Sequence, residues 1–221
     1  MTKHSESLLF ATLLTLAGGL QDTYSYALRG HVFVNALTGN VVLLALSLVN
    51  GDFMQISHYL VQILAFALGV YLSARIVFSE RHFFGIHWQP FILFGEVVTL
   101  FAVGFLPHNF DNLANFLMAT CCGIQVNTFR KFKDINFATT MCVGNVRTIM
   151  HHLAGFHHTK KHEHRHRSRT VFYIVFVFFF GATIGSFFLP ILGIRTIWIS
   201  ALFLLFAFIL LQFEKGESKA R

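Results

Sequence analysis

The sequence predicts an all-α integral membrane protein with six transmembrane helices and two re-entrant half-helix segments, arranged as an inverted 3+3 repeat. Three observations lead to this class. Hydrophobic residues make up 55% of the 221 residues and charged residues only 12%, whereas soluble domains carry about 25% charged residues. Several windows of about 20 residues contain almost no charge. Two further apolar stretches are interrupted near their middle by a glycine-containing triplet.

Six apolar segments are expected to cross the bilayer completely. The first follows a short polar N-terminus and has no small-residue cleavage motif behind it, which predicts a membrane helix and not a cleaved signal peptide. Its C-terminal half carries several polar residues, and a carboxylate stands at the centre of the third segment. The six segments are 8–28, 56–78, 88–106, 113–129, 170–189 and 194–213.

The two interrupted stretches are residues 31–50 and 136–152, which are broken by Thr-Gly-Asn and Val-Gly-Asn respectively. Both triplets suit a turn or a helix start better than a helix centre. We expect the chain to run inward as extended backbone over 31–38 and to return as a short helix over 40–49. At about 1.5 Å per residue, such a helix covers roughly half of the hydrocarbon thickness. Non-helical backbone at this depth must be buried in protein or line a wet cavity.

The distribution of Lys and Arg indicates whether these stretches cross the membrane, because basic residues concentrate in short cytoplasmic loops. The alternative fold has eight shorter spans, which would divide the basic residues nine to seven and leave Arg147 inside the membrane. If both interrupted stretches enter and leave on one side, the division becomes 15 to 2, with Arg29 and Arg195 as the two outer residues. The sequence therefore predicts six spans with both termini cytoplasmic. The net charge of +7 follows from this orientation and does not indicate nucleic-acid binding.

The second half of the sequence resembles the first. A Gly-x-Gln motif, the Gly-Asn of the triplets and a pair of small residues one helical turn apart on one face recur at offsets of 104, 105 and 112 residues; the small pairs are Gly69 with Ser73 and Gly181 with Gly185. Because each half holds three spans, an odd number, we expect the second half to be inserted upside down relative to the first. We predict a single membrane domain over 1–221, with repeat 1 at about 7–106 and repeat 2 at about 111–213.

Two half-helix starts near the membrane centre would present free backbone N–H groups and positive dipole ends. Such groups favour an anion or a partial negative charge, which predicts a ligand site. The alternative interpretation is that the polar residues only cap the half-helices and hold them against neighbouring glutamines. The candidate ligand-binding residues are Gln21, Asp22, Thr38, Gly39, Asn40, Gln125, Asn127, Gly144 and Asn145.

Asp22 and Glu96 are the carboxylates that fall within the predicted spans. A charge in the hydrocarbon region is costly, so such residues usually face the protein interior, pair with another group or titrate. Both are therefore candidates for proton coupling. The alternative is a neutral, hydrogen-bonded carboxyl or, for Asp22, a position close to the wet outer surface.

Residues 157–169 are rich in His, Lys and Arg and predict a flexible cytoplasmic loop. We expect this loop to lie against anionic lipid head groups. A metal site is the alternative, with His162, His164 and His166 as its ligands. No hydrolase, metalloprotease or nucleotide-binding motif is present in the sequence. We therefore predict neither an enzymatic activity nor a cofactor or resident metal.

The segment GGLQDTYSYALRGHVFVNALTGN resembles the first signature of the YoaK-like (UPF0700) family of bacterial integral membrane proteins, domain of unknown function 1275. The later segments GIQVNTFRK and CVGN are similar to its second signature, from which Val126, Val143 and Asn145 depart. The resemblance implies a multi-pass protein of the bacterial inner membrane and no known substrate. The residues that match the first signature are Asp22, Gly30, Phe33, Thr38, Gly39 and Asn40.

The sequence thus predicts a transporter or channel for a small polar or anionic solute, with its site at the paired half-helix starts. The alternative is a non-transporting membrane scaffold or a subunit of a larger complex, and the sequence leaves the oligomeric state open. A cavity that reaches Gly39 and Gly144 would favour transport. A closed interior packed with Phe would favour the scaffold.

Overall fold

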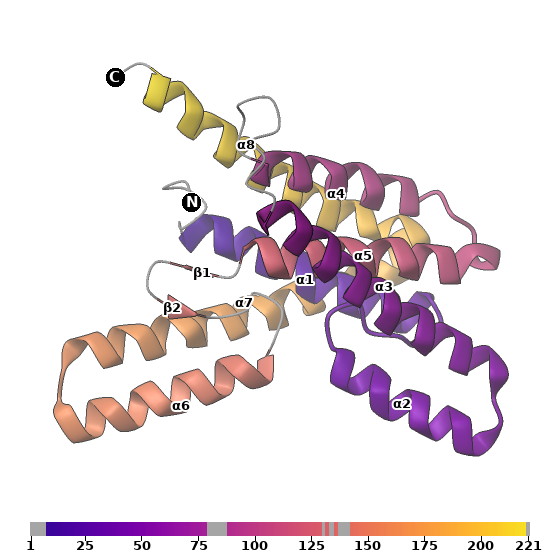
Figure 1. Ribbon diagram of the computed structural model, residues 1–221, viewed down its shortest axis with the longest axis horizontal. Coiled ribbons are helices and arrows are strands. Elements are labelled where there is room, and N and C mark those ends of the chain that lie inside the picture. Colours follow the sequence, from indigo (N-terminus) through magenta and orange to yellow (C-terminus); the bar gives the residue numbers. More distant parts are fainter. Residues whose placement is uncertain (1–7, 79–87, 130, 133–134, 137–141, 220–221) are drawn as a thin grey trace.

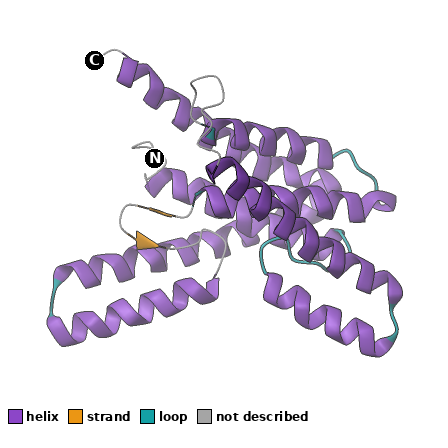
Figure 2. Ribbon diagram, viewed as in Figure 1, coloured by secondary structure: helices purple, strands orange, loops and turns teal. Residues whose placement is uncertain are grey.

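The computed structural model describes residues 8–78, 88–129, 131–132, 135–136 and 142–219, and these residues are almost entirely helical (Figures 1 and 2). The described part also contains the short 3-10 helices η2 (His108–Phe110) and η3 (Gly193–Thr196), and a two-residue antiparallel pair of β1 (Lys131–Phe132) and β2 (Ile135–Asn136). The α-helices are α1 (Leu8–Leu28), α2 (Leu37–Asn50), α3 (Phe53–Phe78), α4 (Gln89–Val103), α5 (Asp111–Thr128), α6 (Cys142–Thr159), α7 (His162–Leu192) and α8 (Ile197–Lys219). The predicted helical class is confirmed.

Two segments of the described chain are long and apolar enough, taken alone, to cross a bilayer. They are Phe53–Ile76 in α3 and His162–Gln212, which runs through α7 and α8. Large apolar side chains also point away from the molecule, among them Val49 at 87% exposure and Phe53 at 82%. Soluble proteins rarely expose apolar side chains on this scale, whereas such faces are expected in contact with lipid.

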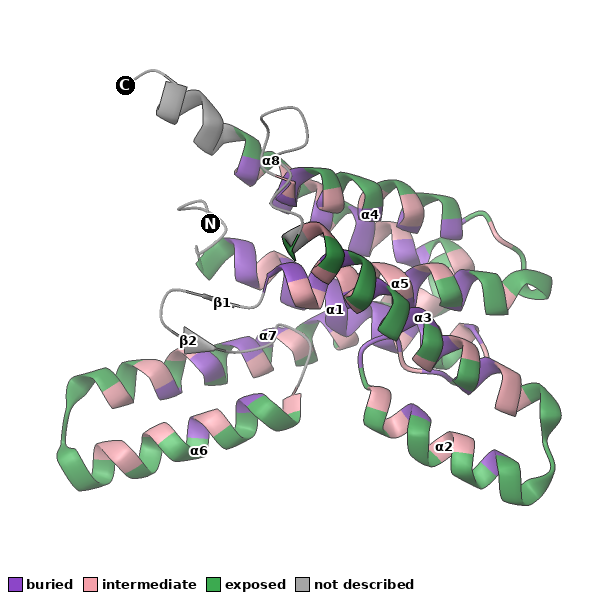
Figure 3. Ribbon diagram, in the orientation of Figure 1, coloured by how far each residue is buried: buried purple, intermediate pink, exposed green. Residues whose placement is uncertain are grey.

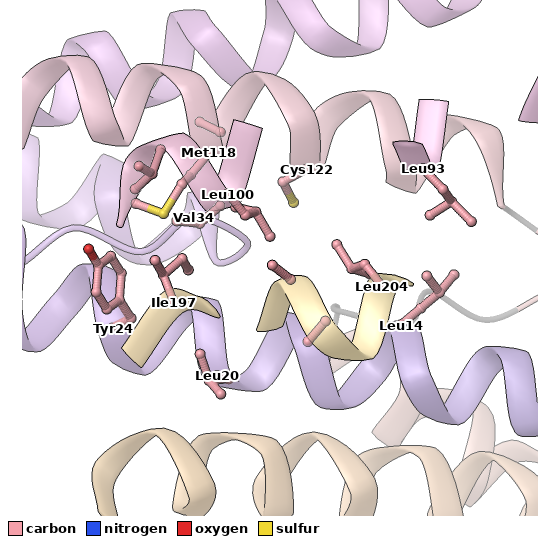
Figure 4. Close-up of a cluster of buried hydrophobic side chains, with 14 of the residues drawn as sticks. Leu14, Leu20, Tyr24, Val34, Leu93, Leu100, Met118, Cys122, Ile197 and Leu204 are labelled. Atoms are coloured by element: carbon pink, nitrogen blue, oxygen red, sulfur yellow. The ribbon is translucent and has the colours of Figure 1, made fainter. Parts of the chain in front are cut away.

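Helices α1, α4, α5 and α8 enclose the hydrophobic core. Helix α4 packs against both α5 and α8, and α1 packs against α8. Their side chains meet in one cluster between the helices (Figure 4). Its labelled members are Leu14, Leu20 and Tyr24 from α1, Val34 from the segment between α1 and α2, Leu93 and Leu100 from α4, Met118 and Cys122 from α5, and Ile197 and Leu204 from α8.

Helix α3 packs along α5, and glycines allow the two backbones to approach closely. A Cβ atom placed at Gly69 would overlap the Thr120 carbonyl, and one placed at Gly123 would overlap the Phe66 carbonyl. No residue other than glycine fits at such positions, so the helix contact itself requires these two residues.

Helix α7 packs along α1 through the same kind of contact. A Cβ atom at Gly19 would overlap the Phe178 carbonyl, and one at Gly181 would overlap the Leu16 carbonyl. Helices α3 and α7 therefore lie outside the four-helix core, each held against one core helix by a pair of glycines.

After α1 ends, the chain turns back and runs beside it. The Asn35 backbone N–H donates to Asp22 Oδ1 at 2.7 Å, and Asn35 Nδ2 donates to the Gly18 carbonyl at 3.1 Å. Because an α-helix rises about 1.5 Å per residue, Gly18 lies roughly 15 Å from the C-terminal end of α1. Helix α2 begins at this depth and leads outward to Gly51, whose φ of +71° turns the chain into α3. Figure 1 shows α2 and α6 starting near the middle of the bundle and running toward opposite ends.

The prediction of a flexible loop over 157–169 is wrong. Helix α6 continues to Thr159 and α7 begins at His162, so only two residues connect an antiparallel helix pair (Figure 1). An ion pair one turn apart, Arg167 Nη2 to Glu163 Oε1 at 2.7 Å, supports the first turns of α7. Hydropathy identifies these residues as polar, but it does not distinguish a polar loop from helices that extend beyond the bilayer.

Candidate functional site

A small polar network lies where the returning chain passes between α1 and α5. Asp22 Oδ1 accepts two hydrogen bonds from Asn35, one from the backbone N–H at 2.7 Å and one from Nδ2 at 3.3 Å. The Cys122 thiol donates to Asn35 Oδ1. Asp22 is only 7% exposed, so the alternative of a position at the wet outer surface is wrong for this residue. Its carboxylate holds the extended segment at depth in the protein.

The Thr-Gly-Asn triplet lies inside the first turn of α2, which begins at Leu37, and not in a turn before the helix. Asn40 is fully buried, and its side-chain amide makes two hydrogen bonds to the backbone of Phe33, in the segment before the helix. Its Oδ1 accepts from the Phe33 N–H at 2.9 Å and its Nδ2 donates to the Phe33 carbonyl at 2.6 Å. A Cβ atom at Gly39 would meet the Phe33 ring at 3.2 Å, whereas Thr38 is exposed. Asn40 therefore ties the start of α2 to the segment that precedes it.

The corresponding triplet of the second half lies in the first turn of α6, which begins at Cys142. Asn145 is buried there, and a Cβ atom at Gly144 would meet no atom within 4 Å. The predicted inward path ahead of this triplet falls on 137–141, which lies outside the described residues. Figure 3 shows that α2 and α6 are mostly exposed along their outer faces.

The remaining polar candidates lie at helix interfaces. Gln21 Nε2 donates to Ser200 Oγ at 3.0 Å between α1 and α8, and Asn127 Nδ2 donates to Ser73 Oγ at 2.9 Å between α5 and α3. Gln125 is buried, and its Nε2 has no hydrogen-bond partner in the described part of the chain. Gln21 and Asn127 therefore bond at two different helix interfaces. The sequence could not show this, because spacing along a helix gives the face of a residue but not the neighbouring helix.

A cavity of about 310 Å³ lies between α4 and α5. Glu96 forms part of its wall and is only 2% exposed, as the position of this carboxylate within a span predicts. Neither Glu96 oxygen has a hydrogen-bond partner of normal geometry within the described chain, although Gln21 approaches it from α1. No residue of α2 or α6 lines this cavity, so it is not the cavity expected at Gly39 and Gly144.

Arg29 is a buried charge that the sequence analysis assigned to an outer loop. Its Nη1 lies 2.7 Å from Asp111 Oδ1, and its Nη2 donates to the carbonyls of Val103 at 3.1 Å and Leu106 at 2.8 Å. Its Nε donates to the Tyr24 hydroxyl at 3.0 Å. Arg29 thus donates to the Val103 carbonyl at the end of α4 and to the Leu106 carbonyl in the turn that follows it. Arg29 is one of only two basic residues on the predicted outer side, and this unusual position was the signal in the sequence that could have marked it as a structural residue.

Two histidines join the polar ends of α6 and α7. His152 Nδ1 lies 3.1 Å from His164 Nδ1, whereas His162 and His166 are exposed. Partial burial, followed by the charges of His164 and Arg167, lowers the pKa of His152 from its ordinary value. The described residues contain no group of three or more potential metal ligands.

Comparison with known proteins places the sequence beside membrane proteins without an assigned activity. Residues 10–210 match a family described as "Protein of unknown function (DUF1275)". The sequence is also similar to the UPF0700 transmembrane protein YoaK of Bacillus subtilis (strain 168), with 25% identity over 151 residues, 65% of this chain and 66% of the relative. The chain therefore spans just under two thirds of that relative's length. No solved structure matches.

Proposed function

The chain belongs to the DUF1275 family of YoaK-like transmembrane proteins, and from this premise we propose that it is a small-solute transporter of the bacterial inner membrane. In this proposal six helices cross the bilayer, α2 and α6 are re-entrant half-helices, and both termini are cytoplasmic. The two halves form an inverted repeat, an architecture that recurs among secondary transporters.

The observation that carries the proposal is a set of matched helix contacts between the two halves. Gly19 contacts α7, and 104 residues further on Gly123 contacts α3. Gly69 contacts α5, and 112 residues further on Gly181 contacts α1. Helix α3 of the first half therefore packs along α5, the first helix of the second half. Helix α7 of the second half packs in the same way along α1, the first helix of the first half.

The contacted atoms repeat with the same offsets. The carbonyls of Phe66 and Phe178, 112 residues apart, face the first pair of glycines. The carbonyls of Leu16 and Thr120, 104 residues apart, face the second pair. Figure 1 shows α1 and α5 running in opposite directions, as α3 and α7 also do. These features support a second half that is inverted relative to the first.

The proposed solute site lies at the start of the half-helices, beside the network of Asp22 and Asn35. Ala36 precedes α2 and supplies no side-chain cap, so the first amides of this helix remain available to a ligand. The positive end of the helix dipole favours the anionic part of a small polar solute. A proton on Asp22 would weaken its hold on the Asn35 N–H, which would couple protonation to movement of the inward segment.

A scaffold role remains the second candidate, because a specific observation favours it. The cavity between α4 and α5 receives no residue from α2 or α6, and the interior beside α1 is filled by a cluster of aliphatic side chains. A transporter must therefore open a path that this conformation keeps closed. A scaffold needs no such opening.

A cysteine-accessibility scan tests the proposed topology. Single cysteines at Asp52, His108 and Gly193, in a variant without the native cysteines, should react from outside the cell with a reagent that does not cross the membrane. Cysteines at Ser79 and Lys160 should react only from the cytoplasmic side. Labelling of position 52 from the cytoplasm would refute the re-entrant path and restore eight spans.

A flux assay tests transport. The purified chain is reconstituted into liposomes that contain a pH-sensitive dye, and nitrate, phosphate, acetate and glycine are added outside in turn. We expect at least one solute to drive a proton flux that Asp22→Asn abolishes and that Asp52→Asn, at an exposed turn, leaves unchanged. If no solute in this panel crosses faster than it does in protein-free liposomes, the scaffold becomes the better interpretation.

A further inference from the structure

The cavity between α4 and α5 has the composition of a binding site for an apolar molecule. Its volume of about 310 Å³ falls at the lower end of the range for small-molecule sites. Aromatic and aliphatic residues, including Phe91 and Phe116, form most of its wall. A fully apolar cavity would not fix the orientation of a bound ligand. The wall of this one includes a buried carboxyl group, Glu96, with no hydrogen-bond partner in the described part of the chain.

The polar atoms around the cavity accept hydrogen bonds more readily than they donate them. Thr99 already donates its hydroxyl to the Gly95 carbonyl at 2.8 Å, and Thr120 donates its hydroxyl to the Phe116 carbonyl at 2.8 Å. Their oxygens therefore keep only acceptor lone pairs for a ligand. Glu96 adds two further oxygens that have no hydrogen-bond partner among the described residues; both are buried from water-sized molecules, so a ligand reaches them when the Glu96 side chain turns toward the cavity. A ligand that complements this site must bring hydrogen-bond donors, and a positive charge complements it best because an unpaired buried carboxylate is costly.

Access to the cavity is through the lipid phase. The outward-facing residues of α4 next to the cavity are large and apolar, among them Phe94 at 52% exposure and Val98 at 51%. In a membrane this face contacts acyl chains, so a water-soluble cation has no direct path to Glu96. A molecule that dissolves in the bilayer can reach it laterally. Glu96 lies midway along α4, between Gln89 and Val103, so the charged group would bind well away from both ends of the helix.

We propose that the cavity between α4 and α5 binds lipophilic amines, with the ammonium group donating to Glu96 and the apolar part filling the space beside Phe91 and Phe116. The site is separate from the half-helix starts, so the inference does not depend on transport, but it rests on the proposed topology in which α4 crosses the bilayer. A ligand here would contact the carboxyl group that Gln21 approaches from α1.

The test uses radiolabelled 1-aminoadamantane, a compact apolar primary amine, and the purified full-length chain in lipid nanodiscs. Binding to protein-free nanodiscs is subtracted. We expect saturable binding for which 1-adamantanecarboxylate, of the same shape and opposite charge, does not compete. Glu96→Gln, which is nearly isosteric, should weaken binding by about tenfold or more, the usual value of a hydrogen bond to a charged group. Glu163→Gln, at an exposed carboxylate of α7, should bind as the native protein does.

A second variant keeps the test decisive if Glu96→Gln does not fold. A Cβ atom at Gly95 would meet no atom within 4 Å, so Gly95→Phe can place a ring in the cavity without disturbing the backbone. This variant should lose binding altogether. Absence of saturable binding to the native protein, or equal competition by the carboxylate, would overturn the proposal. Binding that survives in Gly95→Phe would also overturn it, and binding lost there but unchanged in Glu96→Gln would refute the role of the charge.

Discussion

The side chain of Asn40 holds the inward segment to the start of α2, and its removal should destabilise the protein. Asn40→Leu keeps the branched shape of the side chain, at a larger volume, but removes both hydrogen bonds to the backbone of Phe33, at 2.9 and 2.6 Å. Asn40 is fully buried, so water cannot replace its amide. Asn50→Leu, at the exposed end of the same helix, changes the same residue type without these losses.

The expected magnitude follows from the two backbone groups that lose their partners. Each unsatisfied buried group costs about 1–3 kcal/mol, and the additional apolar burial of Leu offsets roughly 1–2 kcal/mol of the total. The two groups together cost about 2–6 kcal/mol, so the net loss of unfolding free energy has a midpoint of about 2.5 kcal/mol. For a chain of this size, each kcal/mol lowers the melting temperature by about 2–4 °C, so this midpoint corresponds to a fall of about 5–10 °C.

Thermal unfolding followed by far-ultraviolet circular dichroism measures the effect, with the native protein and both variants in the same detergent. We expect the melting temperature of Asn50→Leu to stay within about 2 °C of the native value, because exposed substitutions usually change stability by no more than about 0.5 kcal/mol. If both variants melt together, Asn40 does not stabilise the inward segment, and its predicted place in the site is lost as well.

Three further predictions concern the rest of the fold. Arg29→Met should lower the unfolding free energy by about 3–5 kcal/mol by leaving buried partners unpaired, whereas the exposed Arg75→Met should have little effect; similar denaturation midpoints would contradict this. Gly123→Ala should destabilise by about 1–3 kcal/mol because its Cβ overlaps the α3 backbone, while Gly144→Ala, with open space around it, should be neutral or slightly stabilising in the same melts. Because the folded-state pKa of His152 is lowered, the stability of the α6–α7 pair should be full above the ordinary value of 6.5 and be lost as pH falls below it; amide protection factors in α6, corrected for the intrinsic exchange rate at each pH, should fall between pH 7.5 and 5, and protection factors that do not change with pH would refute the assignment.

Local signals in the sequence were sufficient for the helices and for several polar positions. The apolar segments predicted α1, α3, α4, α5, α7 and α8 to within several residues at most ends, and the triplets predicted a break at the start of α2 and α6. Gly69 and Ser73 were expected on one face of a helix, and both face α5. Glu96 was expected inside a span and is buried. These successes share a cause, because helix periodicity and hydropathy are properties of neighbouring residues.

Other features depended on which segments meet in space. The polar residues 157–169 predicted a loop but form the ends of α6 and α7, because helix pairing continues beyond the apolar region. Arg29 was expected at the surface, yet the carbonyls at the end of α4 and the carboxylate of Asp111 enclose it. Three of the candidate ligand residues, Gln21, Asp22 and Asn127, bond to three different elements, namely α8, the segment before α2, and α3.

By itself, the sequence determined the membrane class and the depth at which polar groups interrupt the apolar segments, because both follow from the composition of single segments. Only the tertiary structure decided that α3 packs on α5 and α7 on α1, and that Glu96 faces a cavity while Asp22 faces Asn35. In a bilayer, lipid tails and protein interiors are equally apolar, so hydropathy does not identify the partner of a helix. Close contact between backbones does, and it depends on residues that lie far apart in the chain.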